Sequence, residues 1–223
     1  MKELIIGIND NTKVLANLIR KENKLIDYIN YNGSESFRLN ENYLFSLAFI
    51  VVDYNNPNEV ISANNLANLL HSMYSICVIT IACNTKSVKD ELYYNSSAIT
   101  YIEKVNNLND EAIINIINNI SIIFDDTNDI RIGIDDIYYI NKNNHEFSVI
   151  TSSSKECFSN IEEEIKNHKN YILYVETNNL FEIYDIHSTL NLLHLNYKED
   201  VEIIFCFKKT NESENINIKI LAF

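Results

Sequence analysis

Residues 45–82 read FSLAFIVVDYNNPNEVISANNLANLLHSMYSICVITIA, and this stretch decides the fold class. Phe45 to Val52 and Ile76 to Ala82 are short, almost continuous apolar runs, which are typical of strands buried on both faces. Glu59 to Met73 lies between them and places apolar residues at helical spacing. The stretch therefore predicts two parallel strands joined by a helix.

The same alternation of strand and helix continues in both directions along the chain. The further predicted elements are the strands Leu4–Ile8, Leu25–Tyr31 and Ile99–Val105 and the helices Val14–Ile19, Lys86–Tyr94 and Asn109–Phe124. Strands that alternate with helices at this spacing favour a parallel, doubly wound sheet. The first half of the chain is therefore expected to be an α/β domain that ends in a long apolar helix.

The pattern changes after Asp125. Ile130–Ile140 and His145–Ile150 are predicted to be irregular strand or loop, followed by helices at Ser154–His168 and Ile183–Leu195 and strands at Tyr171–Val175, Val201–Phe207 and Ile216–Leu221. Lys208 to Asn215 is polar enough for a hairpin loop between the last two strands. These elements predict a smaller α+β layer with a mixed sheet.

Composition and charge exclude several classes of partner. The chain has 223 residues, 31 of them acidic and 18 basic, and a net charge of −13. No cluster of Lys or Arg stands out, so neither a nucleic acid nor direct membrane contact is expected. We find no apolar run long enough to span a bilayer and no signal-peptide pattern, which predicts a cytoplasmic protein. The abundance of Asn and Ile indicates a low-GC genome, as in a low-GC bacterium.

Cysteine and histidine give no sign of a metal site. Four cysteines stand singly in apolar stretches and are predicted to be buried, reduced thiols: Cys77, Cys83, Cys157 and Cys206. His187 and His194 are seven residues apart, and two helical turns separate their Cα atoms by about 10 Å. That distance is too long for them to share one metal ion readily, so no metal ligand is predicted.

The second half of the chain resembles the C-terminal domain of FtsZ, the bacterial relative of tubulin. The segment from Ser154 to Ile165 is similar to the family's helix of type ENRAVEAAEKAI, and Glu202–Phe207 is similar to its strand NIIFGAV. Ile216–Phe223 is similar to the last strand, VRVTVIATGF, and Leu173–Asn179 stands where the family has a strand and the turn GGPDLSLFEV. The order and spacing of these matches carry the resemblance.

The resemblance implies a three-part organisation. Residues 1–108 would form a reduced Rossmann-like domain of the nucleotide-binding type, 109–125 the central helix, and 126–223 the FtsZ C-terminal-like domain. Ile5–Ile8 falls on the family's first strand, and Phe49–Val52 falls on the strand before its tubulin signature. The largest loss of chain lies between Tyr31 and Tyr43.

The phosphate-binding loops of the family are changed in this sequence. The loop after the first strand reads Asn9-Asp10-Asn11 where the family has a glycine-rich loop. The signature GGGTGTG falls on Asn55–Ile61, which contains no glycine. Pro57 donates no N–H, and Glu59 would repel a phosphate. These departures predict a degenerate GTP site.

The hydrolytic residues are also largely missing. In the family a loop of pattern NxDxxD from one subunit completes the GTP site of its neighbour. Here Asp136 falls on the second acidic position, Gly133 falls on the first, and Arg131 replaces the asparagine. Asp135 and Asp136 could instead be a solvated pair of acids at the end of a strand. GTP hydrolysis is therefore not expected.

Three functions follow as hypotheses. The first is an FtsZ/tubulin-like structural or regulatory protein that uses no cofactor and acts through protein contacts, either with itself or with an FtsZ-like filament, for example in cell division. The second is a divergent but active GTPase, in which Asn11 and Thr12 contact phosphate, magnesium is bound, and Asp136 serves the neighbour's water. The third is a small-ligand binding module at the carboxyl ends of the parallel strands.

Overall fold

The computed structural model describes part of the chain in detail. The described residues are 3–8, 26–31, 39, 45–83, 98–102, 110–140, 147–152, 168–177, 191, 201–210 and 217–223. They fall into two compact units, Met1–Asn118 and Asn119–Phe223. The division lies within one helix, α3 (Asp110–Ile123), so each unit is described by itself.

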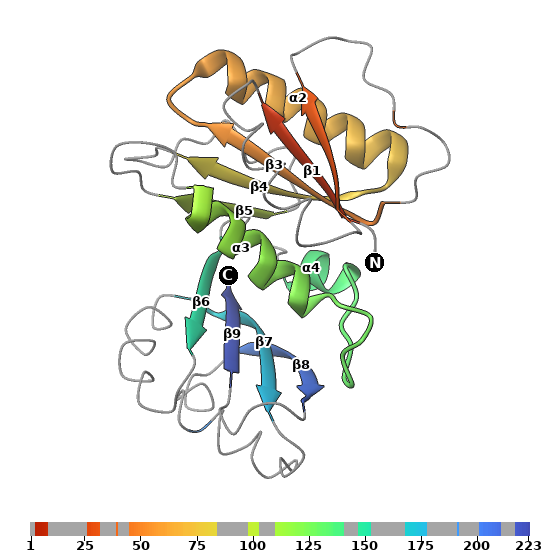
Figure 1. Ribbon diagram of the computed structural model, residues 1–223, viewed down its shortest axis with the longest axis vertical. Coiled ribbons are helices and arrows are strands. Elements are labelled where there is room, and N and C mark those ends of the chain that lie inside the picture. Colours follow the sequence, from red (N-terminus) through yellow and green to blue (C-terminus); the bar gives the residue numbers. More distant parts are fainter. Residues whose placement is uncertain are drawn as a thin grey trace. The chain divides into compact units, whose positions relative to one another are not determined.

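The first unit is built on a parallel sheet of five strands (Figure 1). In chain order the strands are β1 (Glu3–Ile8), β2 (Ile26–Tyr31), β3 (Leu47–Asp53), β4 (Cys77–Cys83) and β5 (Ala98–Ile102). Their order across the sheet is β2-β1-β3-β4-β5, and every neighbouring pair is parallel. The prediction of a parallel sheet in the first half is confirmed.

The helix α2 (Pro57–Tyr74) joins β3 to β4 and crosses one face of the sheet (Figure 1). Its buried apolar residues are Val60, Ala63, Leu66, Ala67 and Leu70. They belong to a core that includes Ala48, Ile50 and Val52 of β3, because alternate residues of a strand face the same side. Residues 48 to 52 of β3 and 78 to 82 of β4 are all nearly inaccessible to solvent, as their apolar runs predict.

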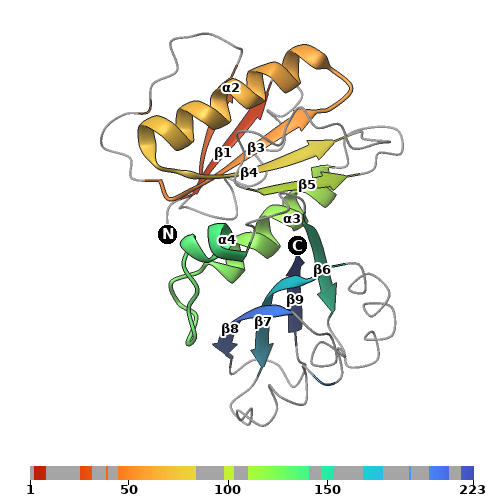
Figure 2. The ribbon, with the colours of Figure 1, turned by 180° about the vertical axis from the view of Figure 1, so that it is seen from behind.

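The second unit contains a mixed sheet of four strands (Figure 2). The strands are β6 (Ser148–Ser152), β7 (Asn170–Thr177), β8 (Glu202–Lys209) and β9 (Asn217–Ala222), and their order is β6-β9-β7-β8. β7 and β8 are parallel, whereas β9 is antiparallel to β6 and β7. The overall class is therefore α/β with one parallel and one mixed sheet, as predicted.

Two predictions for the second unit are wrong. β8 and β9 do not form a hairpin, because β9 lies between β6 and β7 while β8 pairs with the other side of β7. The burial of β7 agrees with this order. Residues 171 to 175 are 0% exposed, as expected for a central strand whose two edges are covered by the neighbouring strands β9 and β8. Ile130–Ile140 is not wholly irregular either, because its second half forms a short helix, α4 (Asp135–Ile140).

Three of the four cysteines are buried thiols, as predicted: Cys77, Cys83 and Cys206. Cys157 lies outside the described residues, as do the predicted helices at Val14–Ile19 and Lys86–Tyr94 and all of Ser154–His168 except His168. Within the described ranges, no helix combines the length and the apolar character that crossing a bilayer would require. No cluster of acidic, histidine or cysteine side chains suited to a metal ion is found among those same residues.

Candidate functional site

The loop between β3 and α2, from Asp53 to Glu59, is the candidate site of the first unit. In a parallel sheet ligands bind outside the carboxyl ends of the strands, where the strand order reverses. The order β2-β1-β3-β4-β5 reverses between β1 and β3, and this loop leaves the carboxyl end of β3. It is also the segment to which the sequence resemblance assigns the family's glycine-rich signature.

Local sequence explains why α2 starts in this loop. Asn56 has an extended backbone (φ −104°, ψ 101°), and its side-chain Oδ1 accepts a hydrogen bond from the Asn58 N–H at 3.2 Å. This is the usual role of an N-cap asparagine, and the following Pro57 suits the first helical position because its missing N–H has no helical acceptor there. The same Pro57 removes one donor that a glycine loop would offer to a phosphate.

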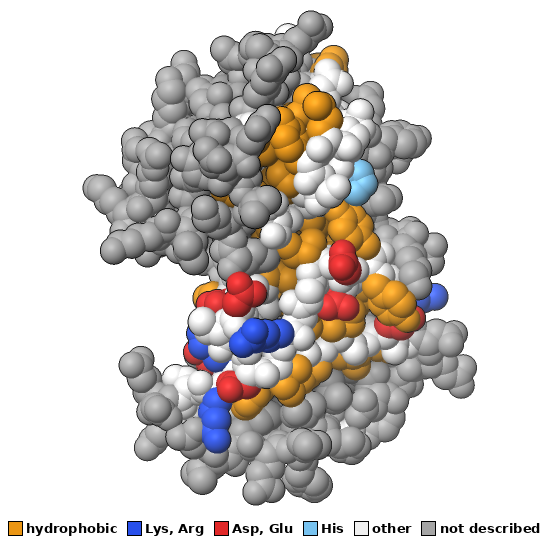
Figure 3. Space-filling model, turned by 90° about the vertical axis from the view of Figure 1, so that its right-hand side faces the viewer, with side chains coloured by type: hydrophobic (Ala, Val, Ile, Leu, Met, Phe, Trp, Pro, Cys, Tyr) orange, Lys and Arg blue, Asp and Glu red, His pale blue; other side chains and the backbone are white. Residues whose placement is uncertain are grey.

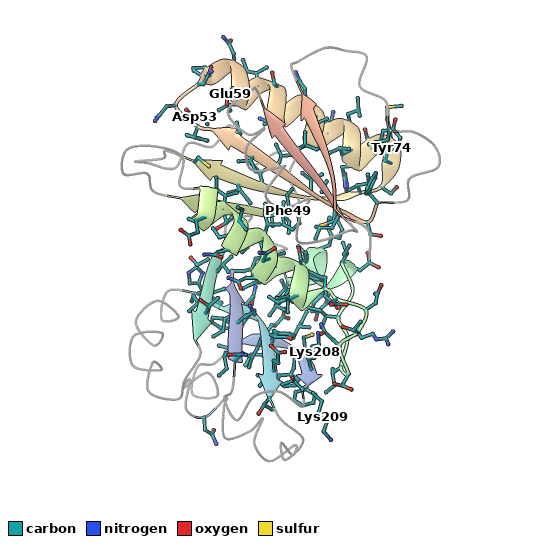
Figure 4. The ribbon with its side chains drawn as sticks, in the orientation of Figure 1. Phe49, Asp53, Glu59, Tyr74, Lys208 and Lys209 are labelled. Carbon is teal, nitrogen blue, oxygen red and sulfur yellow. The ribbon has the colours of Figure 1, made fainter. Side chains whose placement is uncertain are left out.

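Glu59 occupies the space at the start of α2 (Figure 4). Its side chain is only 7% exposed. One carboxylate oxygen, Oε2, accepts a hydrogen bond from the Asp53 N–H at 3.1 Å, and the other, Oε1, accepts one from the Asn56 side-chain amide at 3.0 Å. A buried carboxylate requires such donors, because its desolvation is otherwise costly.

Every backbone N–H from Asp53 to Val60 has an acceptor within the chain. The acceptors are Glu59 Oε2 for Asp53, Cys83 O for Tyr54, Asp53 Oδ1 for Asn55, Asp53 O for Asn56, Asn56 Oδ1 for Asn58, and Asn56 O for both Glu59 and Val60. The donor–acceptor distances lie between 2.9 and 3.2 Å. The loop is thus a closed hydrogen-bonded turn whose amides point at its own acceptors.

Asp136, which is catalytic only under the divergent-GTPase hypothesis, lies in the first turn of α4 in the second unit. Its carboxylate Oδ2 accepts a hydrogen bond from the Gly133 N–H at 2.7 Å, and its own N–H donates to the Gly133 carbonyl at 3.1 Å. Asp135 stands beside it in the same turn and is exposed. The alternative placement of these acids at the end of a strand is wrong, because they begin a helix.

The loop before α4 is fixed to the sheet by Asn128, which is 1% exposed. Its side-chain Nδ2 donates to the carbonyls of Ile122 and Ile123, both at 3.0 Å, at the end of α3. The same amide lies 3.2 Å from Sγ of Cys206 on β8. Asn128 therefore satisfies carbonyls that the end of α3 leaves without helical donors, and it sets where the loop leaves the helix.

Backbone pairing continues this attachment. The Asp129 and Ile130 N–H groups both donate to the Phe207 carbonyl, at 2.8 and 3.1 Å, and the Phe207 N–H donates back to Ile130 at 3.1 Å. The Lys209 N–H donates to the Asp129 carboxylate at 2.6 Å. The segment from Asp129 to Asp136 is thus held at both ends, by β8 and by the first turn of α4.

Large apolar side chains are exposed on this segment and on the helix α4 that follows it. Ile130 is 44% exposed, Tyr138 37% and Tyr139 51%. On the face of the molecule in Figure 3, apolar side chains lie among acidic and basic ones over the described part of the chain. Tyrosine is among the residues enriched in protein–protein interfaces, so Tyr138 and Tyr139 are candidates for contact with another protein.

Sequence reasoning found some of these residues and missed others. Asn11 and Thr12, the phosphate contacts of the divergent-GTPase hypothesis, lie outside the described residues. The sequence shows that Glu59 and Pro57 are unfavourable to phosphate, but it does not predict the hydrogen bond that the Asp53 N–H donates to the Glu59 carboxylate. Asn128 was missed entirely. The spacing of Asn56 and Glu59, which resembles a capping box, was the one available signal for the closed loop.

Comparison with known proteins identifies the fold. No protein-family model matches the chain, and no curated protein sequence matches it either. Among solved structures, an empty FtsZ dimer from M. jannaschii matches with a TM-score of 0.70 at 10% identity, over 99% of this chain and 87% of that one. CetZ from Methanosaeta thermophila matches with a TM-score of 0.69 at 9% identity, over 99% and 86% of the two chains.

A third similar structure is TubZ from Bacillus thuringiensis serovar israelensis, solved as GDP-form protofilaments. Its TM-score is 0.62 at 8% identity, and the match covers 100% of this chain and 88% of that one. The three matches extend over nearly the whole chain. The protein therefore has the FtsZ/tubulin-like fold that the sequence resemblance implied.

Proposed function

We propose that this protein is an FtsZ/tubulin-like structural or regulatory protein that acts through protein–protein contacts and does not depend on GTP. It would associate with itself or with an FtsZ-like filament, for example during cell division. The observation that carries this proposal is the closed β3–α2 loop, in which the chain's own acceptors engage every N–H from Asp53 to Val60.

The chemistry of phosphate binding explains why this observation matters. A loop that cradles phosphate does so with free backbone N–H groups and the positive end of a helix dipole. In the β3–α2 loop those N–H groups are engaged, and the Glu59 carboxylate stands at the helix start. A phosphate oxygen about 4 Å from a carboxylate would be repelled by roughly 4 kcal/mol at an effective dielectric constant near 20. Such a penalty would remove about half of the binding free energy of a micromolar ligand.

Protein contact is supported by two further features. The segment from Ile130 to Tyr139 exposes three large apolar side chains on a backbone that Asn128 and β8 hold in place. The structural relatives include an FtsZ dimer, TubZ protofilaments and a helical model of a two-stranded TubZ filament. The same fold forms assemblies in those proteins. Under this proposal it would also allow the present protein to assemble, but without a bound nucleotide.

Sedimentation of the purified protein without nucleotide tests this proposal. We expect the protein to form assemblies larger than a monomer, or to pellet with filaments of FtsZ from a low-GC bacterium. The double variant Tyr138→Ser, Tyr139→Ser should reduce either association at least tenfold. The matched control is Met73→Ser, which removes an apolar side chain that is 69% exposed on α2 and should leave association unchanged.

The outcomes separate the three hypotheses. A protein that stays monomeric and is absent from the filament pellet would contradict the proposal. Phosphate release from GTP that rises with protein concentration would favour the divergent GTPase with Asn11, Thr12 and Asp136. Stabilisation by a metabolite unrelated to guanine nucleotides would favour the ligand-binding module.

A further inference from the structure

Strand β8 lies at the edge of the four-stranded sheet (Figure 1). Among the described strands, β8 pairs only with β7. An edge strand presents a row of backbone N–H and C=O groups to other chains, so natural proteins usually protect it with charged residues, proline or a bulge. Residues 203 to 207 of β8 are Ile, Ile, Phe, Cys and Phe, and they include neither a charge nor a proline.

Backbone hydrogen bonds show which residues of β8 direct their polar groups away from the sheet. The Glu202 N–H donates to the carbonyl of Lys169, next to the start of β7, at 3.2 Å. Successive residues of a paired strand direct their N–H and C=O groups to opposite sides, so the even-numbered residues of β8 face β7 and the odd-numbered ones face outward. The Phe207 N–H accordingly donates outward, to the Ile130 carbonyl at 3.1 Å.

Two outward positions of β8 have open backbone groups. Among the residues that the structure describes, none forms a hydrogen bond with the outward N–H or C=O of Ile203 or Phe205. Both side chains are partly buried against the apolar core of the sheet, as are those of Val201 and Phe207. Open backbone groups beside apolar side chains suit the addition of another strand, in which main-chain hydrogen bonds supply the affinity.

The two ends of β8 carry opposite charges. Glu202 begins the strand and Lys208 and Lys209 end it, and in the sequence Glu199-Asp200 stands just before it. If two β8 strands align antiparallel, the acidic start of each lies toward the basic end of the other, whereas a parallel alignment brings like charges together. Copies of a chain with a net charge of −13 otherwise repel each other. The charge pattern therefore favours a second copy of this chain in the antiparallel orientation.

We propose that β8 pairs antiparallel with β8 of a second copy, about a two-fold axis at Ile204. In this register Ile203 of each copy lies opposite Phe205 of the other, and both pairs exchange backbone N–H···O bonds in both directions. A two-fold contact uses the same surface on both copies, so it closes as a dimer. The bond from Phe207 to Ile130 occupies the next outward position and ends the pairing there. The inference deepens the proposed function, on which it rests, by naming a second copy as the partner.

Removal of one outward N–H tests the pairing. Ile203→Pro deletes this N–H, and proline is tolerated on an edge strand where its missing N–H faces outward. Ile203→Ala is the matched control, because it also shortens the side chain but keeps the N–H. In sedimentation velocity without nucleotide, we expect the dissociation constant of the dimer to be roughly tenfold or more higher for Ile203→Pro than for Ile203→Ala, since each copy loses one main-chain bond to the other. Equal constants would overturn the inference.

Disulfide cross-linking tests the register and does not depend on the proline variant folding. At the two-fold axis, residue 204 of one copy lies opposite residue 204 of the other at a non-hydrogen-bonded position, where Cα atoms are about 4.5 Å apart. A disulfide can bridge that distance, so Ile204→Cys should form a covalent dimer under mild oxidation. Met73→Cys replaces a side chain that is 69% exposed on α2 and should remain monomeric on a non-reducing gel. A monomeric Ile204→Cys, or equal cross-linking of the two variants, would contradict the pairing.

The results also separate this inference from the proposed function. Wild-type protein that assembles or pellets with filaments, together with an Ile204→Cys variant that does not cross-link, contradicts the β8 pairing alone. Cross-linking of Ile204→Cys in a protein that dimerises only with GTP bound supports the β8 pairing and contradicts the proposed function. Wild-type protein that stays monomeric and is absent from the filament pellet contradicts both.

Discussion

The side-chain amide of Asn128 lies 3.2 Å from Sγ of Cys206, a residue 78 positions further along the chain. This contact joins the end of α3 to the sheet of the second unit and places the segment that carries Asp136. Sγ of Cys206 also lies within hydrogen-bonding distance of the carbonyls of Ile123 and Ile130, at 3.3 and 3.1 Å, and its single S–H can donate to either one. The pair is the structural anchor of the exposed segment that we propose contacts a partner.

Replacing Asn128 tests this anchor. Asn128→Ala removes one hydrogen-bond donor from each of the carbonyls of Ile122 and Ile123, so we expect a loss of about 1–3 kcal/mol in the free energy of unfolding. The matched control is Asn115→Ala, an exposed position of α3, which should change stability by less than about 0.5 kcal/mol. Equal losses in the two variants, measured by urea denaturation, would show that Asn128 is not an anchor.

The stability of the protein should fall at alkaline pH. Burial raises the pKa of the Cys206 thiol from 9.0 to about 11. A group whose pKa is higher in the folded state favours folding below its unfolded pKa, and that contribution is lost as the pH rises through the folded pKa. The free energy of unfolding should therefore decrease between about pH 9 and pH 11.

Comparison with Cys206→Ala isolates this effect. The variant has its own constant loss of stability, but the part of the alkaline decrease that comes from Cys206 should disappear. Burial also raises the pKa of Tyr171 to about 12. Both proteins contain Tyr171, so its contribution cancels when the pH dependence of one is subtracted from that of the other. Urea denaturation of the two proteins at pH 8, 9.5 and 11 provides the measurement. Parallel pH curves would rule out the raised thiol pKa.

The N-cap of α2 can be tested by itself. Asn56→Ala removes the acceptor of the Asn58 N–H and the donor to Glu59, so it should cost about 1–2 kcal/mol of stability. Asn58→Ala changes an exposed side chain in the same turn and should cost much less. Thermal denaturation measures both variants, and a reversed ranking would refute the hydrogen-bonding scheme of the loop.

Asp136 is expected to stabilise a helix start and not to support catalysis. Asp136→Ala removes the acceptor of the Gly133 N–H and should lower stability by about 0.5–2 kcal/mol, while Asp135→Ala, which is exposed, should lower it less. Neither variant should alter phosphate release from GTP, since we expect none above background. Release that the wild type shows and Asp136→Ala abolishes would establish a catalytic role.

Much of the fold could be predicted from the sequence, and the reasons are physical. Strands buried on both faces must be apolar at nearly every position. β3 and β4 are therefore recognisable in the sequence as continuous apolar runs, one before and one after the helix α2, which has an apolar face. The pairing of β9 with β6 and β7 could not be predicted in the same way. The order of strands in a sheet depends on contacts between distant segments. The polar loop between β8 and β9 would have the same kind of sequence whether or not those two strands paired with each other.

The candidate site was predicted only in part for a similar reason. The charge of Glu59 and the missing N–H of Pro57 are properties of single residues, so their conflict with phosphate is evident in the sequence. The hydrogen bond from the Asp53 N–H to the Glu59 carboxylate depends on how the loop closes, and the burial of Asn128 depends on Cys206 in a distant strand. An asparagine between polar neighbours otherwise indicates an exposed turn.

The central claim is that this FtsZ/tubulin-like fold does not use GTP, and a thermal melt tests it most directly. The protein is heated with and without GTP or GDP, each with magnesium, at concentrations far above a micromolar dissociation constant. A ligand at a hundred times its dissociation constant adds about 2.7 kcal/mol, which for a chain of this length shifts the midpoint by roughly 5–10 °C. We predict no shift with either nucleotide; a shift of that size would contradict the account.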